Sequence, residues 1–323
     1  MVKKIVVLAT GGTIAGSSTS SLSGKYESGK IDINDILDSF DEIKDIAKVC
    51  GIDICNIGSQ NMNENIWLEL ARKCNELLSS NEVDAIVITH GTDTLEESAY
   101  FLNLTIKSHK PVVMSAAMRS HNSLSSDGAI NLYNAISVAA ADESAGMGVL
   151  VVINDEIHLA REVSKMDTIA LNAFSSPNCG KCGIVHYGKV KFYTKSLRQH
   201  TLQSKFNPDI LPRVDILYDY AGAKIETLYK SNAIKGIVCA ALGNGNLSPQ
   251  MLKFLKSARD NEVVVVISSR VNGGVINGSE LDFAELGFIA SDSLNPQKSR
   301  VLLMLSLSSK EDIEKIRDNF DIY

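Results

Sequence analysis

Short runs of apolar residues, rich in valine and isoleucine, recur along the chain and constrain its fold more than any other feature. In the first half these runs lie at residues 5–9, 83–89, 111–116 and 149–153. Apolar runs of this length, of which the one at residues 5–9 is continuous, are typical of strands that are buried on both faces of a parallel sheet. The intervening sequence predicts a helix over residues 94–108, opened by a capping box, and another that follows Asp127 and continues to residue 141. Strands that alternate with helices predict a parallel α/β sheet with right-handed crossovers.

The same alternation resumes in the second half of the chain. Strands are expected at residues 216–218, 236–241 and 263–267, and helices at residues 225–231, after Ser248-Pro249 and twice near the C-terminus. Residues 188–212 are basic and polar and contain two prolines, so they predict a linker. A chain of 323 residues is long enough for two domains. We therefore predict an α/β fold with an N-terminal domain over residues 1–190, a linker over 191–212 and a C-terminal domain over 213–323.

The composition excludes several classes of protein. The 32 lysines and arginines are scattered and the formal net charge is −6, which argues against a surface for nucleic acid or for an anionic membrane. No apolar run approaches the roughly 20 residues of a membrane-spanning helix. The run at residues 5–9 is too short for the core of a signal peptide. The chain as written therefore predicts a cytoplasmic protein, or a periplasmic one if a signal peptide has been removed.

Glycine and hydroxyl residues follow two of the predicted strands. The first strand leads into Thr10-Gly-Gly-Thr13 and the second into His90-Gly-Thr-Asp-Thr94, while Gly58-Ser-Gln60 is a third polar segment. Ligands of open α/β sheets bind outside the carboxyl ends of the strands, near a topological switch point. The sequence therefore predicts a site at these strand ends, where glycine allows close approach of the backbone and the hydroxyls are candidate nucleophiles.

Each of these residues also has a purely structural interpretation. Thr92 and Asp93 could cap the following helix, His90 could be a turn residue and Lys165 could be a solvated surface charge. No single residue distinguishes the two interpretations. Only the complete set of motifs does.

Two further motifs suggest other functions but lack the required context. The glycine string at residues 11–16 is similar to a dinucleotide-binding turn, which needs a helix directly after it. Here a segment rich in Ser and Gly, residues 16–30, follows and predicts a long loop of the kind that acts as a lid. Cys179 and Cys182 form a C-x-x-C near His186, but no second pair completes a zinc site and no helix follows. We interpret them as loop cysteines.

Eight motifs, taken in order, resemble those of the bacterial L-asparaginases, most closely the type II-like branch. They are ATGGTIAG at 9–16, GSQ at 58–60, ITHGTDT at 88–94, AMR at 117–119, SSDG at 125–128, VLVVIND at 149–155, GNGNL at 243–247 and LNPQK at 294–298. The resemblance covers essentially the whole chain. It implies a larger, doubly wound N-terminal domain with a parallel sheet and a smaller C-terminal α/β domain. It also implies a homotetramer, a dimer of intimate dimers, with active sites between subunits and no metal or organic cofactor.

The activity that this resemblance implies is hydrolysis of L-asparagine to L-aspartate and ammonia, with a minor glutaminase activity. Thr13 matches the threonine nucleophile that forms a β-aspartyl acyl-enzyme, and Tyr26 in the lid matches the residue that bonds to its hydroxyl. Thr92, Asp93 and Lys165 match the second catalytic triad. The residues themselves leave open which threonine attacks and whether water attacks directly.

Other positions match substrate-binding groups of the same family. The matching residues are Ser59, Gln60 and Asp93 for the α-carboxylate and α-ammonium, the Ala117 carbonyl for the side-chain amide, and Asn246 and Glu280 as contacts from the neighbouring subunit. Ser120 departs from the pattern, because many relatives have proline there.

Two other functions stay open beside this one. The first is a tRNA-amidotransferase subunit of asparaginase type, which normally carries an additional N-terminal domain. The second is a non-enzymatic amino-acid-binding module of similar shape, which would lack Thr13, Thr92 and Lys165.

Overall fold

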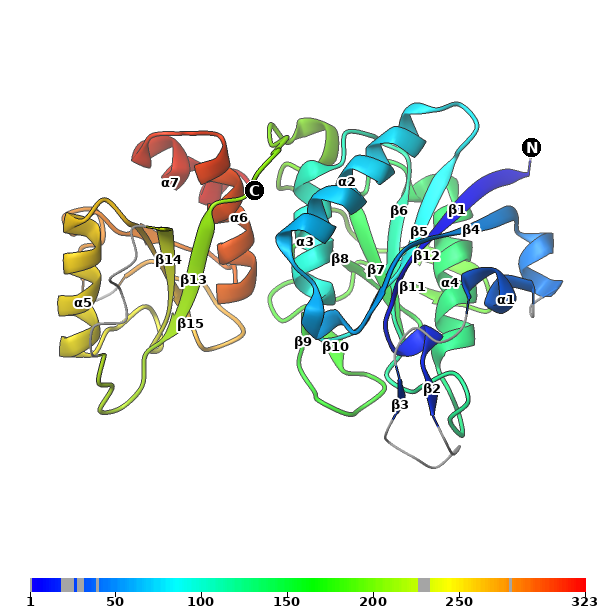
Figure 1. Cartoon of the computed structure of the whole chain (residues 1–323), viewed down its shortest axis with the longest axis horizontal. Coiled ribbons are helices and arrows are strands. Elements are labelled where there is room, and N and C mark those ends of the chain that lie inside the picture. The colour runs from blue at the N-terminus through cyan, green and yellow to red at the C-terminus, as the bar shows by residue number, and fades with distance from the viewer. Residues whose placement is uncertain (1, 19–25, 28–31, 39–40, 226–232, 279–280) are drawn as a thin grey trace. The chain divides into compact units, whose positions relative to one another are not determined.

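The computed structural model of this chain describes residues 2–18, 26–27, 32–38, 41–225, 233–278 and 281–323 (Figure 1). The chain divides into two compact units, Met1–Lys205 and Phe206–Tyr323. This division falls inside the segment 191–212 that we expect to be a linker, and the domain limits at residues 190 and 213 stay a prediction.

The larger unit is built on a sheet whose strands follow the order β12-β11-β8-β7-β6-β5-β1-β4. The strands are β1 (Lys3–Gly11), β4 (Ala47–Ile57), β5 (Ala85–Thr89), β6 (Val112–Ser115), β7 (Val149–Ile153), β8 (Glu156–Leu159), β11 (Gly183–His186) and β12 (Lys189–Phe192). From β4 through β7 neighbouring strands are parallel, whereas β8, β11 and β12 extend the sheet in antiparallel pairs. In this parallel part the chain goes from β1 to β4 on one side and then returns to β5 on the other. The topological switch point therefore lies between β1 and β5.

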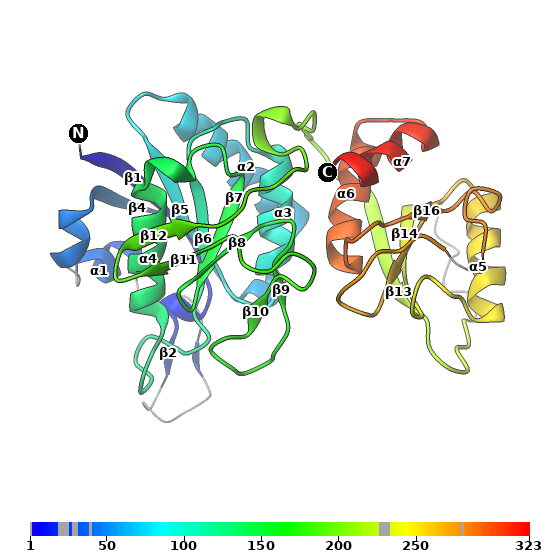
Figure 2. The same ribbon diagram turned by 180° about the vertical axis from the view of Figure 1, so that it is seen from behind.

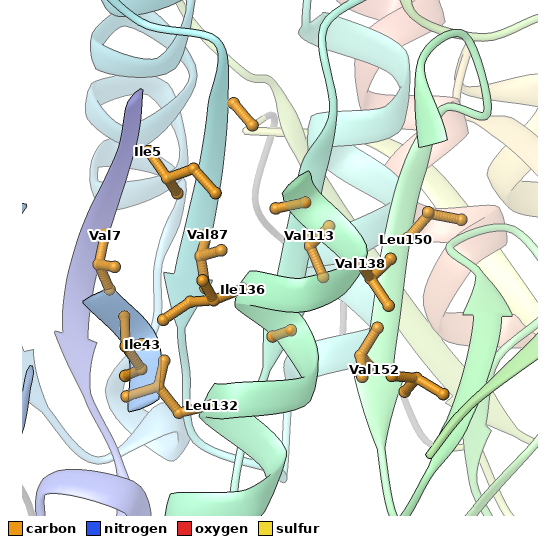
Figure 3. Close-up of a cluster of buried hydrophobic side chains, with 14 of the residues drawn as sticks. Ile5, Val7, Ile43, Val87, Val113, Leu132, Ile136, Val138, Leu150 and Val152 are labelled. Carbon is orange, nitrogen blue, oxygen red and sulfur yellow. The ribbon is translucent and has the colours of Figure 1, made fainter. Parts of the chain in front are cut away.

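Helices cover both faces of this sheet (Figures 1 and 2). Helices α2 (Glu64–Ser79) and α3 (Leu95–Thr105) lie on one face, and α4 (Gly128–Ala140) and the short α1 (Ile33–Asp38) lie on the other. Figure 3 shows α4 side chains such as Leu132 and Ile136 in one buried cluster with Val7, Val87 and Val113 of the strands. Burial of each such side chain stabilises the folded state by roughly 1.5–3 kcal/mol. The ends of these strands are therefore anchored in a well-packed core.

The apolar runs of the first half predict the central strands correctly. They become β1, β5, β6 and β7, and the two expected helices become α3 and α4. The sheet is mostly parallel rather than wholly parallel, because a hairpin reverses the chain after β7. Residues 189–192, which we placed at the start of the polar linker segment, form β12 instead. The segment at residues 16–30 contributes the antiparallel pair β2 (Ser17–Ser18) and β3 (Tyr26–Glu27), while residues 19–25 and 28–30 lie outside the described residues.

The smaller unit contains a parallel sheet in the order β13-β14-β15-β16. Its elements are β13 (Arg213–Tyr218), β14 (Ile234–Ala241), β15 (Val264–Ser269), β16 (Ile289–Ala290), α5 (Pro249–Asp260), α6 (Pro296–Ser308) and α7 (Ile313–Ile322). As predicted, Ser248 caps α5, with its Oγ accepting a hydrogen bond from the Met251 N–H at 3.3 Å. The helix expected at residues 225–231 falls almost wholly outside the described residues. Across the part of the chain that the structure describes, every helix is too short or too polar to cross a membrane.

Candidate active site

Three sequence motifs meet at the carboxyl ends of β4, β1 and β5. The backbone N–H of Gly12, just beyond β1, donates to the Ile57 carbonyl at the end of β4 at 2.9 Å. A Cβ atom added to Gly12 would lie 2.5 Å from the Gly91 nitrogen, and one added to Gly91 would lie 2.6 Å from Ser59 Oγ. These backbones are therefore in direct contact, and Gly12 also has a φ of +78°, which favours glycine. The glycines bring together the loops that carry Thr13, Thr92 and Ser59, at the switch point of the sheet.

Thr92 and Asp93 both bind the side chain of Lys165. Lys165 Nζ donates to Thr92 Oγ1 at 2.9 Å and to Asp93 Oδ1 at 2.7 Å. Lys165 comes from β9 (Ser164–Lys165), which pairs with β10 (Phe174–Ser175) far along the chain from the β5 loop. Thr92 is buried, whereas 61% of the Asp93 side chain is exposed. The cluster is therefore shielded from solvent at Thr92 and exposed to solvent at Asp93.

The structure bears directly on the structural interpretation of these residues. The N-cap of α3 is Thr94, so Thr92 and Asp93 do not occupy the capping position. Lys165 is not a solvated surface charge, since only 17% of its side chain is exposed. A lysine ammonium that donates to a threonine oxygen favours negative charge on that oxygen and can relay a proton.

Ser59 joins the loop after β4 to the loop after β5. Its Oγ accepts a hydrogen bond from the Asp93 N–H at 3.1 Å, and its carbonyl accepts one from Thr94 Oγ1 at 2.9 Å. Ser59 is buried and begins the 3-10 helix η3 (Ser59–Asn61), while Gln60 is exposed beside it. These two hydrogen bonds fix the backbone of the Asp93 loop against Ser59.

Thr13 begins the 3-10 helix η1 (Thr13–Ala15) directly after β1. It is buried, and its carbonyl accepts the Gly16 N–H at 2.9 Å. After the glycines the chain forms η1 and then β2 (Ser17–Ser18), whereas a dinucleotide-binding turn needs an α-helix directly after its glycines. Tyr26 lies in β3, opposite Ser18 of β2, and its contact with Thr13 stays a prediction.

The remaining predicted residues are more widely distributed. Ala117 is buried in the loop after β6. Asn246 belongs to the smaller unit, where a tight turn pairs its backbone with Leu242 through hydrogen bonds of 2.8 and 3.0 Å. Glu280 lies outside the described residues.

The C-x-x-C motif is separate from this cluster. Cys179 is exposed, whereas Cys182 is buried and its Sγ donates to the Ile157 carbonyl at 3.2 Å. Burial raises the pKa of the Cys182 thiol to about 12, so it stays protonated at neutral pH. Among the described residues, the His, Cys, Asp and Glu side chains form no group of three or more that could hold a metal ion.

His90 is wholly buried directly behind the Thr92 loop. Its Nδ1 lies 2.7 Å from the Gly91 carbonyl oxygen, and burial lowers its pKa from 6.5 to about 4. The folded protein therefore keeps this imidazole neutral at a pH where the unfolded chain protonates it. Stability from this group is complete above about pH 6.5 and is lost as the pH falls towards 4, a difference of about 3 kcal/mol.

We expect His90→Gln to lose less folding stability than the parent protein as the pH falls. Thermal unfolding measured between pH 7.5 and 4.5 would show a smaller drop in Tm for this variant than for the parent protein. His109→Gln, at an exposed histidine of the same unit, is the matched control and should keep the parent slope. An unchanged slope in His90→Gln would contradict the assignment.

The structure thus defines a two-unit α/β protein with a threonine–lysine–aspartate cluster at its switch point. A family model described as "Asparaginase, N-terminal" matches residues 4–198, and one described as "Glutaminase/Asparaginase C-terminal domain" matches residues 213–320. The chain belongs to the asparaginase family.

Individual relatives agree with this family assignment over nearly the whole chain. The "Probable L-asparaginase periplasmic" of Haemophilus influenzae is 46% identical, over 98% of this chain and 92% of its own. "L-asparaginase 2" of Escherichia coli is 44% identical, over 99% of this chain and 93% of its own. The crystal structure of a "Probable Cytoplasmic L-asparaginase" from Campylobacter jejuni is 42% identical with a TM-score of 0.93, covering 99% of this chain and all of that one.

Proposed function

We propose that this protein is an L-asparagine amidohydrolase. The observation that carries the proposal is the contact of Lys165 Nζ with Thr92 Oγ1 and Asp93 Oδ1, in a loop packed directly against the residue before Thr13. Together with Thr13, this cluster provides two hydroxyl groups, a cation and a carboxylate at one edge of the sheet. Membership of the asparaginase family supports the choice of substrate, since full-length relatives are named for that amino acid.

In the proposed reaction the Thr13 oxygen attacks the side-chain carbonyl carbon of asparagine. The threonine proton is transferred to the amide nitrogen, the C–N bond breaks, and ammonia leaves a β-aspartyl ester on Thr13. Water then attacks this ester, which releases L-aspartate and restores the hydroxyl. Tyr26 would activate Thr13, and Lys165 would stabilise charge at Thr92 and relay a proton. Backbone N–H groups near Gly12 and Thr92 are suited to stabilise the tetrahedral oxyanion.

The proposed substrate is a zwitterion, so the site must present opposite charges close together. Asp93 provides a carboxylate for the α-ammonium, and Ser59 with neighbouring backbone N–H groups is proposed to bind the α-carboxylate beside Gln60. The Ala117 carbonyl would accept a hydrogen bond from the side-chain amide. Asn246 and Glu280 are proposed to come from a neighbouring subunit of a homotetramer built as a dimer of intimate dimers.

Steady-state ammonia release from L-asparagine and L-glutamine, measured side by side on the purified protein, tests this proposal. We expect asparagine to be preferred by about 10–200-fold in kcat/KM, because one methylene in a pocket is worth that much discrimination. Folded protein that releases ammonia from neither substrate would contradict the proposal. Binding of L-aspartate without turnover would instead indicate an amino-acid-binding module, and activity only with added partner subunits would indicate an amidotransferase.

A further inference from the structure

One buried carboxylate, that of Asp127, holds the loop after β6. Asp127 Oδ2 accepts the Met118 N–H at 2.9 Å, and Asp127 Oδ1 accepts the Arg119 N–H at 2.9 Å. Asp127 immediately precedes α4, and its position is fixed by the packing of that helix on the sheet. The carboxylate therefore connects a rigid element to two consecutive peptide groups of the loop.

The direction of the Ala117 carbonyl follows from this contact. The carbonyl of Ala117 and the N–H of Met118 belong to the same peptide group, and the described part of the chain contains no cis peptide bond. In a trans peptide the C=O and N–H vectors point in opposite directions. Because the Met118 N–H points at Asp127, the Ala117 carbonyl points away from Asp127.

Asn131 fixes the preceding peptide group and Asp127 itself. Its Nδ2 donates to the Ala116 carbonyl at 2.9 Å and to Asp127 Oδ2 at 3.0 Å. Its Oδ1 accepts the Asn154 N–H at 3.0 Å, which ties the pair to the end of β7. Both Asp127 and Asn131 are buried, so these bonds are shielded from water and costly to lose. The orientation of Ala117 is consequently set from both sides.

We infer that Asp127 is a positioning residue for the amide group of the substrate. By holding the Met118 N–H, it aims the Ala117 carbonyl at the site where an amide N–H of asparagine donates. This inference rests on the proposed function, because that function assigns the Ala117 carbonyl to the side-chain amide. Asp127 itself makes no contact with substrate in this account.

The test uses two substrates that differ in the group that the Ala117 carbonyl binds. L-asparagine has an amide N–H, whereas the β-methyl ester of L-aspartate has none, although both would give the same acyl-enzyme. Asp127→Asn keeps the shape but replaces one acceptor oxygen by an NH2 group, which cannot accept a backbone N–H. We expect kcat/KM for asparagine to fall about 10–100-fold, since a misdirected hydrogen-bonding group weakens recognition of the amide. The ester should be hydrolysed at nearly the parent rate.

Several outcomes separate the alternatives. An equal loss on amide and ester would overturn the inference and leave Asp127 a merely structural residue. Parent protein that hydrolyses neither substrate would contradict the proposed function instead. Asp155→Asn is the matched control, because Asp155 Oδ1 binds Asn134 of the same helix at 2.8 Å, and it should leave the amide-to-ester ratio unchanged. Thermal unfolding checks that Asp127→Asn is folded. If it is not, Asn131→Ala is the second variant: it frees the Ala116 carbonyl and should lower the ratio of amide to ester hydrolysis.

Discussion

Replacing Thr13 by alanine is expected to reduce ammonia release from L-asparagine by at least about 10³-fold, because the loss of a nucleophile removes the covalent route altogether. The substitution deletes one hydroxyl and one methyl group at a buried position where η1 begins. Alanine suits this short helix, so the fold should survive. Steady-state kinetics and thermal unfolding of the same sample would distinguish a catalytic loss from an unfolded protein.

Thr105→Ala is a suitable control for the Thr13 variant. Thr105 is also a buried threonine of the larger unit, but its hydroxyl donates to the Phe101 carbonyl within α3. Its loss should cost stability and leave kcat near the parent value. Parent-like activity in folded Thr13→Ala would remove Thr13 from the mechanism and favour attack by Thr92 or by water.

The second large effect is expected at Lys165. Lys165→Met keeps a side chain close in length to the aliphatic part of lysine but removes the ammonium that donates to Thr92 and Asp93. We expect kcat to fall by about 10²–10⁴-fold, the usual contribution of a positioned proton-transfer group. Lys181→Met removes a lysine that forms an ion pair with Glu156 in the same unit and should leave kcat unchanged.

A double-mutant cycle with Thr92→Val makes the Lys165 prediction sharper. If Lys165 acts through the Thr92 hydroxyl, the double variant should be no slower than the worse single variant, because residues that act as a unit are strongly non-additive. Two losses that multiply would show that Lys165 and Thr92 act independently. Such a result would contradict the role derived from their hydrogen bond.

The parts of the fold that could be predicted are those with a strong local signal. The buried strands β1, β5 and β7 have uninterrupted apolar runs, and Ser248-Pro249 marks the start of α5. Strand β4 has no such signal, because it lies at the sheet edge, where exposed residues such as Lys48 and Asp53 interrupt its apolar pattern. Helix α2 is absent from our prediction, although the sequence contains a signal for it: Asn63 Oδ1 caps the helix by accepting hydrogen bonds from two backbone N–H groups.

The candidate site shows the same limit of local reasoning. Thr13 and Thr92 could be placed at one edge of the sheet, because parallel strands share the direction of their carboxyl ends. Lys165 comes from a two-residue strand with no periodicity, and only the family resemblance indicates it. The sequence places Asp127 before a helix and within the SSDG motif, but its two bonds to the backbone of the preceding loop depend on a chain reversal that no local pattern encodes.

The position of β1 between β4 and β5 also has a consequence for how the protein folds. The loops that meet through Gly12, Gly91 and Ser59 belong to strands that are neighbours in space but separated by long stretches of sequence. Contacts of this kind form late and slowly, since the entropy of closing long loops must be overcome first. Recovery of enzymatic activity during refolding should therefore report completion of the central sheet, well after the helical signal has returned.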